Sequence, residues 1–258
     1  VSTNRDAWCW NPSKRKLTEN MGEMITFYNE EVIRFQRRYA ENTPKEKGEL
    51  VQGFLKADPK KISWTVNLKK DLSQGKNYKF QSNCLAAGLY RPFTKQWLYF
   101  NRRFNERVLQ MPKIFPNQEV TNLVIQINAK YIHGQIALIS NVIPDLHCNG
   151  DSQCFPLYLY DEDGTNKREA ITDEGLTHFQ SYYPARQLTK EDIFYYIYGL
   201  LHSEEYRSRY GDNLSKELPR IPRVKRAEDF SAFVKAGRAL AELHLNFETA
   251  PCYKVTLE

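Results

Sequence analysis

The first stretch with side chains suited to recognition chemistry is Thr3-Asn4-Arg5-Asp6. An asparagine amide can form two hydrogen bonds to the edge of adenine, and an arginine guanidinium can do the same with guanine. Asn4 and Arg5 are therefore candidates for contacts to nucleic-acid bases. The alternative is that Arg5 and Asp6 form a structural network at a turn, and the residue types alone leave both interpretations open.

A second stretch, residues 90–103, surrounds a predicted strand with basic and amide side chains. Successive side chains of a strand point to opposite faces, so Trp97 and Leu98 face different ways. We assign the phenylalanine and leucine side chains of this stretch to packing. The polar side chains that remain, and that we predict to contact bases or phosphates, are Arg91, Lys95, Gln96, Arg102 and Arg103.

The third stretch is rich in lysine and runs from residue 45 to residue 79. Lysines beside a duplex supply affinity that does not depend on base sequence and that weakens steeply with salt. The lysines that we predict to contact phosphates are Lys60, Lys61, Lys69 and Lys70. An ordinary solvated surface explains the same residues equally well.

Motifs for catalysis are missing from the sequence. It contains no Gly-x-x-x-x-Gly-Lys-Ser/Thr loop for phosphates and no Gly-x-Gly-x-x-Gly dinucleotide fingerprint. His-Glu-x-x-His and Gly-x-Ser-x-Gly are absent as well. Asn11-Pro12-Ser13-Lys14 does not match the Asn/Asp-Pro-Pro-aromatic loop that an amino-methyltransferase uses for a flipped base.

A metal-dependent nuclease is a further alternative, since carboxylates followed by a lysine can hold the metal and orient the attacking water. Asp145 could supply the first carboxylate, but no Asp/Glu-x-Lys follows it, and Asp58-Pro59-Lys60 lies far upstream. Cys148 and Cys154 flank a turn beside His147, yet a zinc site usually needs closer ligand pairs. We therefore predict no catalytic residues and no metal site, and we expect the histidines to be structural.

Charge is unevenly distributed along the chain. Residues 1–130 contain 23 lysines and arginines against 12 acidic residues, whereas residues 131–258 contain 14 against 19. A basic face requires such clustering rather than a high total, so the first half is the better candidate for binding a polyanion.

Periodicity predicts an α+β protein: a central mixed β-sheet core flanked by an N-terminal long helix and a C-terminal helical cluster. We expect the long helix to begin at Thr18, a loop over residues 41–61 and a second helix over 63–73. Runs rich in aromatic and β-branched residues predict strands at 78–85, 96–100, 120–127, 135–140 and 155–160. Helices follow from about 190, 203 and 227. Residues 1–170 would form an α/β reading region and residues 171–258 a helical subdomain, unless both belong to one continuous domain.

Composition and cysteine use indicate the cellular setting. The five cysteines have no disulfide-framework spacing, which suits a reducing cytoplasm. No apolar run approaches the roughly 20 residues that span a bilayer, so we expect a soluble protein with no membrane partner. The chain begins at Val1 rather than Met, and we expect an excised piece of a longer protein.

A set of short motifs, in order along the chain, resembles one family. They are Thr3-Asn4-Arg5-Asp6-Ala7-Trp8, Phe27-Tyr28-Asn29, Tyr90-Arg91-Pro92-Phe93, Leu98-Tyr99, Phe115-Pro116, Pro144-Asp145, Gln153-Cys154-Phe155-Pro156-Leu157-Tyr158, Tyr198-Gly199-Leu200-Leu201-His202-Ser203, Tyr206-Arg207 and Leu218-Pro219-Arg220-Ile221-Pro222. Together they resemble the C-terminal region of type ISP restriction-modification enzymes, often described as predicted helicases. The resemblance covers nearly the whole chain.

The resemblance implies a target-recognition domain that binds a specific sequence of double-stranded DNA. In that family a nuclease, an ATPase and an adenine methyltransferase share the polypeptide, so the methyltransferase and ATPase domains would be partners. S-adenosylmethionine, ATP and Mg²⁺ would then serve the parent enzyme, and this region would bind none of them. The alternatives are a module that couples motor and methyltransferase without reading DNA, and the nuclease considered above.

Overall fold

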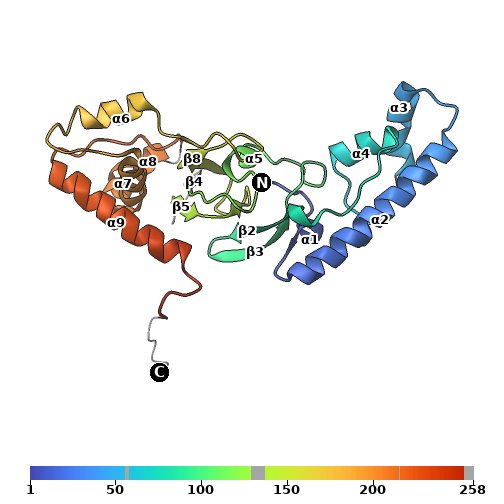
Figure 1. Ribbon diagram of the computed structural model, residues 1–258, viewed down its shortest axis with the longest axis horizontal. Helices are drawn as coiled ribbons and strands as arrows, with labels where there is room; N and C mark the ends of the chain where they lie inside the picture. Colours follow the sequence, from blue (N-terminus) through green and yellow to red (C-terminus); the bar gives the residue numbers. More distant parts are fainter. Residues whose placement is uncertain (56–57, 129–136, 215, 253–258) are drawn as a thin grey trace. The chain divides into compact units, whose positions relative to one another are not determined.

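The computed structural model describes residues 1–55, 58–128, 137–214 and 216–252. Contacts divide the chain into two compact units (Figure 1). Unit 1 comprises Val1–Tyr90 and Thr94–Pro112, and unit 2 comprises Arg91–Phe93 and Lys113–Glu258. Each unit has buried apolar side chains of its own, and we describe them in turn.

Unit 1 is organised by the helix α2 (Lys14–Arg38), which spans 25 residues. The Ser13 hydroxyl caps its first turn by accepting a hydrogen bond from the Lys16 amide at 3.3 Å. Apolar side chains recur at helical spacing and form a buried stripe, since one helix face turns toward the core. This stripe comprises Leu17, Met21, Met24, Ile25, Tyr28, Val32 and Phe35.

Two shorter helices, α3 (Pro44–Phe54) and α4 (Val66–Ser73), complete the helical part of unit 1. Thr43 and Glu46 form a capping box at the start of α3, and Thr65 caps α4. The helices α3 and α4 contact each other, and α4 also packs against α2. Figure 1 shows both near the C-terminal end of α2.

The segment between α4 and the first long strand is held by α2 side chains. Asn29 donates through Nδ2 to the Tyr78 carbonyl at 2.7 Å and accepts from the Tyr78 amide at 2.9 Å. Gln36 donates through Nε2 to the Leu72 carbonyl at 2.9 Å. Gly75, with φ +72°, forms the turn that follows α4. The backbone at Tyr78 is therefore paired with a side chain.

The N-terminal residues of unit 1 pair with a later strand. A one-turn helix, α1 (Asp6–Cys9), leads into β1 (Trp10–Asn11), which pairs antiparallel with β3 (Thr94–Tyr99) with Trp10 opposite Leu98. The strand β2 (Leu85–Arg91) follows the 3₁₀ helix η1 (Ser82–Cys84) and lies next to β3. The tip of the β2–β3 hairpin, Arg91–Phe93, which includes the last residue of β2, is grouped with unit 2.

Unit 2 contains an antiparallel sheet with β4 (Val124–Asn128) between β5 (Ala137–Ser140) and β7 (Ser152–Pro156). Every residue of β5 is buried. A short ribbon pairs β8 (Tyr158–Leu159) with β9 (Arg168–Glu169). The remaining short elements are α5 (Met111–Ile114), where the chain passes between units, and β6 (Ile143–Pro144).

The rest of unit 2 is helical: α6 (Asp173–Gln180), α7 (Lys190–His202), α8 (Glu204–Leu214) and α9 (Ala227–Leu245). The helices α7 and α9 cross at Gly199 and Gly237, where backbone meets backbone (Figure 1). A Cβ at Gly237 would overlap the Tyr195 carbonyl oxygen, and one at Gly199 would overlap that of Phe233. Only glycine allows the two helices to approach this closely.

The predicted α+β class is confirmed, with a long N-terminal helix and a C-terminal helical cluster. The strands lie in more than one sheet rather than a single central one. The predicted helices at 63–73, 190, 203 and 227 are confirmed, as is the strand at 96–100. Strands also occur within the predicted runs 120–127, 135–140 and 155–160, although residues 135 and 136 lie outside the described residues.

Three expectations about individual elements are wrong. The predicted loop over 41–61 contains the capped helix α3. In place of the predicted strand over 78–85, the chain forms the segment that Asn29 holds at Tyr78, followed by η1. The long helix begins at Lys14, four residues before Thr18, whose hydroxyl donates to the Lys14 carbonyl at 2.9 Å instead of capping. The boundary expected between 170 and 171 falls inside unit 2 and stays a prediction about domain organisation.

Within the described residues, no helix has both the length and the apolar character needed to cross a membrane.

Candidate nucleic-acid interface

Net charge separates the two units, as it separates the two halves of the sequence. Unit 1 contains 20 lysines and arginines against 11 acidic residues, and unit 2 contains 17 against 20. Their net charges are therefore +9 and −3. Most of the predicted contact residues belong to the basic unit.

Asn4 and Arg5 have opposite environments. Asn4 is exposed with φ +54°, a left-handed conformation that asparagine tolerates. Arg5 is only 5% exposed; its Nε donates to the Thr3 carbonyl at 3.1 Å, and its Nη1 donates to the Ser63 carbonyl. Burial lowers the pKa of the guanidinium. These bonds tie the N-terminus to the segment before α4, so we do not retain Arg5 as a candidate for base contacts.

Lys60 and Lys61 lie exposed on a turn after α3. Asp58 sets this turn by accepting from the Lys60 amide at 3.0 Å through Oδ1 and from the Lys61 amide at 3.0 Å through its carbonyl. The Lys61 ammonium lies 5.4 Å from the ring centre of Phe27. Both lysines line an open groove of about 510 Å³ together with Trp8 and the face of α2 around Phe27. This groove brings cations and aromatic rings together.

Lys69 and Lys70 lie on α4 and differ in exposure. Lys70 is exposed, whereas Lys69 is half-buried and donates through Nζ to Oε1 of Gln52 on α3 at 3.4 Å. They are not among the residues that line the groove containing Lys60 and Lys61. The predicted lysine loop is thus two separate pairs on ordered elements.

Arg102 and Arg103 follow β3 and lie beside α4. The Arg102 carbonyl accepts from Asn67 at 3.2 Å, and the side chain is exposed. The Arg103 guanidinium lies 3.3 Å from Asp71, a carboxylate with 1% exposure that also accepts from the Tyr78 hydroxyl at 2.5 Å. Burial, together with this bond, raises the pKa of Tyr78. Arg103 therefore compensates a buried charge, and Arg102 is the better placed of the two for an external contact.

The remaining predicted residues belong to the β2–β3 hairpin. Arg91, which counts with unit 2, forms an ion pair with the buried Asp145 at 3.2 Å. Lys95 and Gln96 are half-buried on β3 in unit 1. The neighbouring Trp97 packs under the Lys14 ammonium, 4.5 Å from its ring centre. The structure places these polar side chains on an ordered hairpin.

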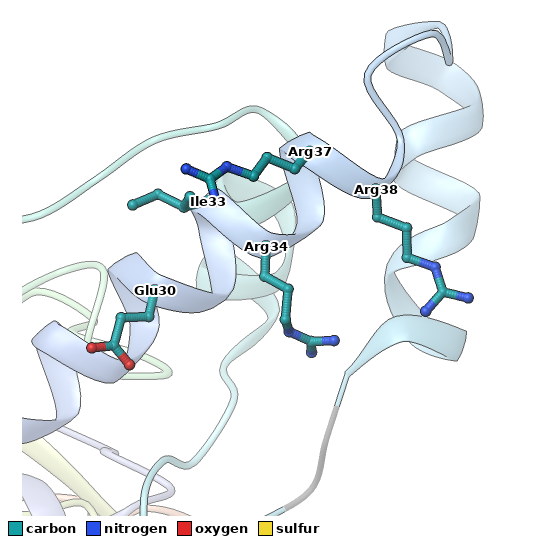
Figure 2. Close-up of a pocket in the computed structure, with 5 residues that line it drawn as sticks. All are labelled: Glu30, Ile33, Arg34, Arg37 and Arg38. Atoms are coloured by element: carbon teal, nitrogen blue, oxygen red, sulfur yellow. The ribbon is translucent and has the colours of Figure 1, made fainter.

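A set of arginines on α2 was not among the predicted contact residues. Arg34, Arg37 and Arg38 line an open groove with Glu30 and Ile33 (Figure 2). Their spacing of three and four residues places them on one side of a helix, and this spacing is visible in the sequence. Helical periodicity assigns them only to the polar faces of the helix, so it does not reveal their clustering.

The residues considered for other chemistry have ordinary structural roles. Asp58 and Asp145 lie in different units, and Asp145 accepts from Arg91 and from the His147 amide. Burial raises the pKa of the Cys148 thiol to about 12. In the part of the chain that the structure describes, no three histidine, cysteine, aspartate or glutamate side chains are grouped so that they could hold a metal ion.

Two histidines of unit 2 meet around Tyr198. The Tyr198 hydroxyl is 2.5 Å from Nδ1 of His244, and Nδ1 of His202 is 2.8 Å from the Tyr198 carbonyl. Burial lowers the pKa of both imidazoles, and each histidine lies near a further cationic or titratable group. These histidines join α7 to α9, which agrees with their predicted structural role.

Comparison with known proteins gives one consistent result. The family model described as Type ISP C-terminal specificity domain matches residues 1–257. Among solved structures, the chain resembles the cryo-EM structure of a DrdV–DNA complex, with 32% sequence identity and a TM-score of 0.84. No curated protein matches the chain.

Two further solved structures are similar over the same extent. One is a nuclease-deletion mutant of the Type ISP restriction-modification enzyme LlaGI in complex with a DNA substrate mimic, with 34% identity and a TM-score of 0.82. The other is the ATP-dependent Type ISP restriction-modification enzyme LlaBIII bound to DNA, with 33% identity and a TM-score of 0.79. In all three comparisons 98% of this chain is covered, whereas it spans 23%, 22% and 16% of the DrdV, LlaGI and LlaBIII chains.

Proposed function

Because the chain belongs to the family of Type ISP C-terminal specificity domains, we propose that it recognises a specific base sequence in double-stranded DNA. The observation that carries this proposal is the likeness, over 98% of the chain, to three proteins whose structures were solved with DNA or a DNA mimic. The net charge of +9 on unit 1 supports it, since phosphate neutralisation supplies most of the affinity for a duplex.

Base reading and phosphate binding would use different residues. Contacts to bases would come from Asn4 and from the hairpin and loop residues Arg91, Lys95, Gln96, Arg102 and Arg103. Contacts to phosphates would come from Lys60, Lys61, Lys69 and Lys70. Arg103 and Arg91 would have to exchange or share their ion pairs with Asp71 and Asp145 to do so.

The domain would contribute specificity to a larger enzyme and no catalytic residue. It would position an adenine methyltransferase over its target base and license an ATP-driven motor, both in the same polypeptide. S-adenosylmethionine, ATP and Mg²⁺ would bind in those other domains. This division of labour agrees with the small share of each solved chain that the domain spans.

Selection from a random duplex library tests the proposal and does not require the target sequence to be known. The chain is mixed with the library at low and at moderate salt, and bound duplexes are sequenced after several rounds. We expect one short sequence to be enriched and to bind more tightly than an unrelated duplex at both salt concentrations. Measurable binding without enrichment would contradict sequence recognition.

Arg102 and Arg103 offer a matched pair of substitutions in the loop that follows β3. We expect Arg102→Ala to weaken binding to the selected duplex by about 1–3 kcal/mol, the value of a bidentate base contact. Arg103→Ala should in addition lower the free energy of unfolding, because Asp71 stays buried with less compensating charge. Titration with the selected duplex and urea denaturation of both variants separate the two roles. Equal losses of Arg102→Ala on selected and unrelated duplexes would assign Arg102 to phosphate instead.

A further inference from the structure

One face of α2 combines features that the proposed contacts to bases do not explain. Glu30, Ile33, Arg34, Arg37 and Arg38, which we call the arginine stripe, line an open groove of about 480 Å³ (Figure 2). Figure 2 shows Arg37 extending toward Ile33, while Arg34 and Arg38 extend in another direction. The guanidinium groups therefore flank the groove instead of crowding at one point.

Two of the arginines are available for an external anion. Arg37 and Arg38 are exposed, and among the described residues neither has an acidic side chain within ion-pair distance. The Arg38 guanidinium lies 5.6 Å from the ring centre of Tyr39, and the residue is exposed. Their positive charges are therefore not compensated within the described structure.

The third arginine is held in place. Arg34 donates to both carboxylate oxygens of Glu31, with 2.8 Å from Nε to Oε1, and its guanidinium lies 3.8 Å from the ring centre of Phe54 on α3. The Glu31 side chain is 9% exposed. Arg34 thus forms an ordered edge of the groove at low cost in side-chain entropy.

The helix dipole explains part of this arrangement. Arginines in the last turn of a helix interact favourably with its free carbonyl groups, by about 0.3–1 kcal/mol each. That term does not explain Ile33, which is 48% exposed in the middle of the stripe. It also does not apply to Arg34, which lies one turn earlier and is already neutralised by Glu31.

We infer that the arginine stripe holds the phosphate backbone of a DNA duplex, separately from the residues that read bases. This inference rests on the proposed function. Arg34 and Arg38 are separated by about 6 Å along the helix, at 1.5 Å per residue. A DNA strand carries one charge per about 3.4 Å, so this separation spans about two phosphate steps, and the uncompensated Arg37 and Arg38 are the arginines that would each meet a phosphate. Ile33 lies beside Arg37 (Figure 2) and would cover a sugar next to the phosphate that Arg37 meets, and the Glu30 carboxylate lies between this contact and the groove containing Lys60 and Lys61.

An acidic protein surface is the competing ligand, because arginine and exposed isoleucine also occur at protein interfaces. The duplex is favoured because the groove containing Lys60 and Lys61 shares Glu30 with the arginine stripe. Lys60 and Lys61 lie on the turn after α3, so they add two cations in the adjoining groove, whose α2 residues include the acidic Glu23. An extended polyanion can meet both groups of cations, whereas a compact acidic patch would meet only one of them.

The salt dependence of duplex binding tests the inference. The dissociation constant of the Arg37→Gln/Arg38→Gln variant is measured between 50 and 200 mM salt on an unrelated duplex. Loss of two phosphate contacts should reduce the slope of log affinity against log salt by about 1.8. Between 50 and 200 mM salt, the variant would therefore lose about twelvefold less affinity than the unsubstituted chain loses. Arg37→Lys/Arg38→Lys keeps both charges and should retain the original slope.

The matched control is Arg209→Gln/Lys235→Gln, which removes two exposed charges from unit 2. It should keep the original slope, and circular dichroism with thermal melting verifies that every variant is folded. Equal slopes for the stripe and control variants would overturn the inference. So would a stripe variant that binds duplexes normally but loses binding to polyglutamate, since the ligand would then be an acidic protein. If the unsubstituted chain binds no duplex at 50 mM salt, the proposed function itself fails.

Discussion

At the scale of single residues, Asn4 and Arg5 show what a residue type reveals and what it does not. Both can pair with bases, and the sequence predicts that chemistry for each. The sequence does not say that Arg5 reaches the Ser63 carbonyl, 58 residues away, and becomes buried there. Whether a recognition-type side chain is available depends on long-range packing, which has no local trace.

Substitutions at these two positions should therefore differ in their effect. We expect Arg5→Ala to lower the free energy of unfolding by about 2–3 kcal/mol, because two buried carbonyls lose a charged donor. Asn4→Gly should change it by less than about 0.5 kcal/mol, since glycine accepts a positive φ. Urea denaturation of both variants measures the difference. An Arg5→Ala variant of unchanged stability that binds DNA poorly would restore Arg5 as a contact residue.

The α2 arginines show the converse at the same scale. Their spacing is visible in the sequence, but a polar helix face is usually solvated, and the pattern gives no reason to single it out. Two facts from the folded chain distinguish this face: Phe54 lies under Arg34, and Ile33 stays exposed beside Arg37. The candidate site was thus predictable in residue type and in its location in the basic half, but not in its individual members.

At the scale of helices and strands, local signals predicted the elements that they control directly. Thr189 and Asp192 form the capping box of α7, whose start near residue 190 was predicted, and the same pattern at Thr43 and Glu46 starts α3. The glycines at 48 and 53 are typical of loops and obscure that second cap in the sequence. Both glycines have no neighbour within 4 Å of an added Cβ, so they lie on the open side of α3 and do not interrupt it.

Long-range hydrogen bonds explain the missing strand at 78–85. Its aromatic residues fit a strand by type, but the Asn29 side chain pairs with both backbone groups of Tyr78. Those groups are then unavailable to a neighbouring strand. A side chain 49 residues away decides the structure, and no periodicity could reveal it.

The α7–α9 crossing gives a prediction at this scale. Gly237→Ala should lower the free energy of unfolding by about 1–3 kcal/mol or more, since the new methyl group overlaps the Tyr195 carbonyl. Gly211→Ala on α8 is the matched control; with open space around it, it should stabilise by about 0.5–1 kcal/mol. Thermal and urea denaturation of both variants provide the comparison. Similar stabilities for the two variants would show that the helices can separate without cost.

At the scale of the whole molecule, charge was the most reliable guide. The asymmetry between residues 1–130 and 131–258 in the sequence persists as +9 and −3 on the two units. The exact grouping was not predictable, because Arg91–Phe93 count with unit 2 through contacts such as Arg91 with Asp145 and Phe93 with His244. No sequence pattern indicates that a hairpin tip belongs to a different unit from the strands that it connects.

Histidine is distributed even more unevenly than charge. All five histidines of the sequence lie beyond residue 112, so unit 1 contains none. In unit 2, His202 lies against Tyr198, His244 and the Arg207 charge, and the Tyr198 hydroxyl is within hydrogen-bond distance of Nδ1 of His244. Protonating either imidazole would place a cation beside the other or beside Arg207, and this adds to the burial that lowers both pKa values.

A mildly acidic pH should therefore loosen unit 2 and spare unit 1. Because both histidines have folded pKa values below the unfolded value of about 6.5, their contribution to stability is present above pH 6.5 and is lost as the pH falls below it. Hydrogen exchange is measured between pH 7.5 and 5.0 and corrected for intrinsic rates. This range lies above the pH near 4 at which carboxylates titrate. We expect protection of α7 and α9 to fall while that of α2 is kept, and His244→Gln to reduce the pH dependence in α9. Equal loss of protection in α2, which belongs to the unit without histidines, would contradict this prediction.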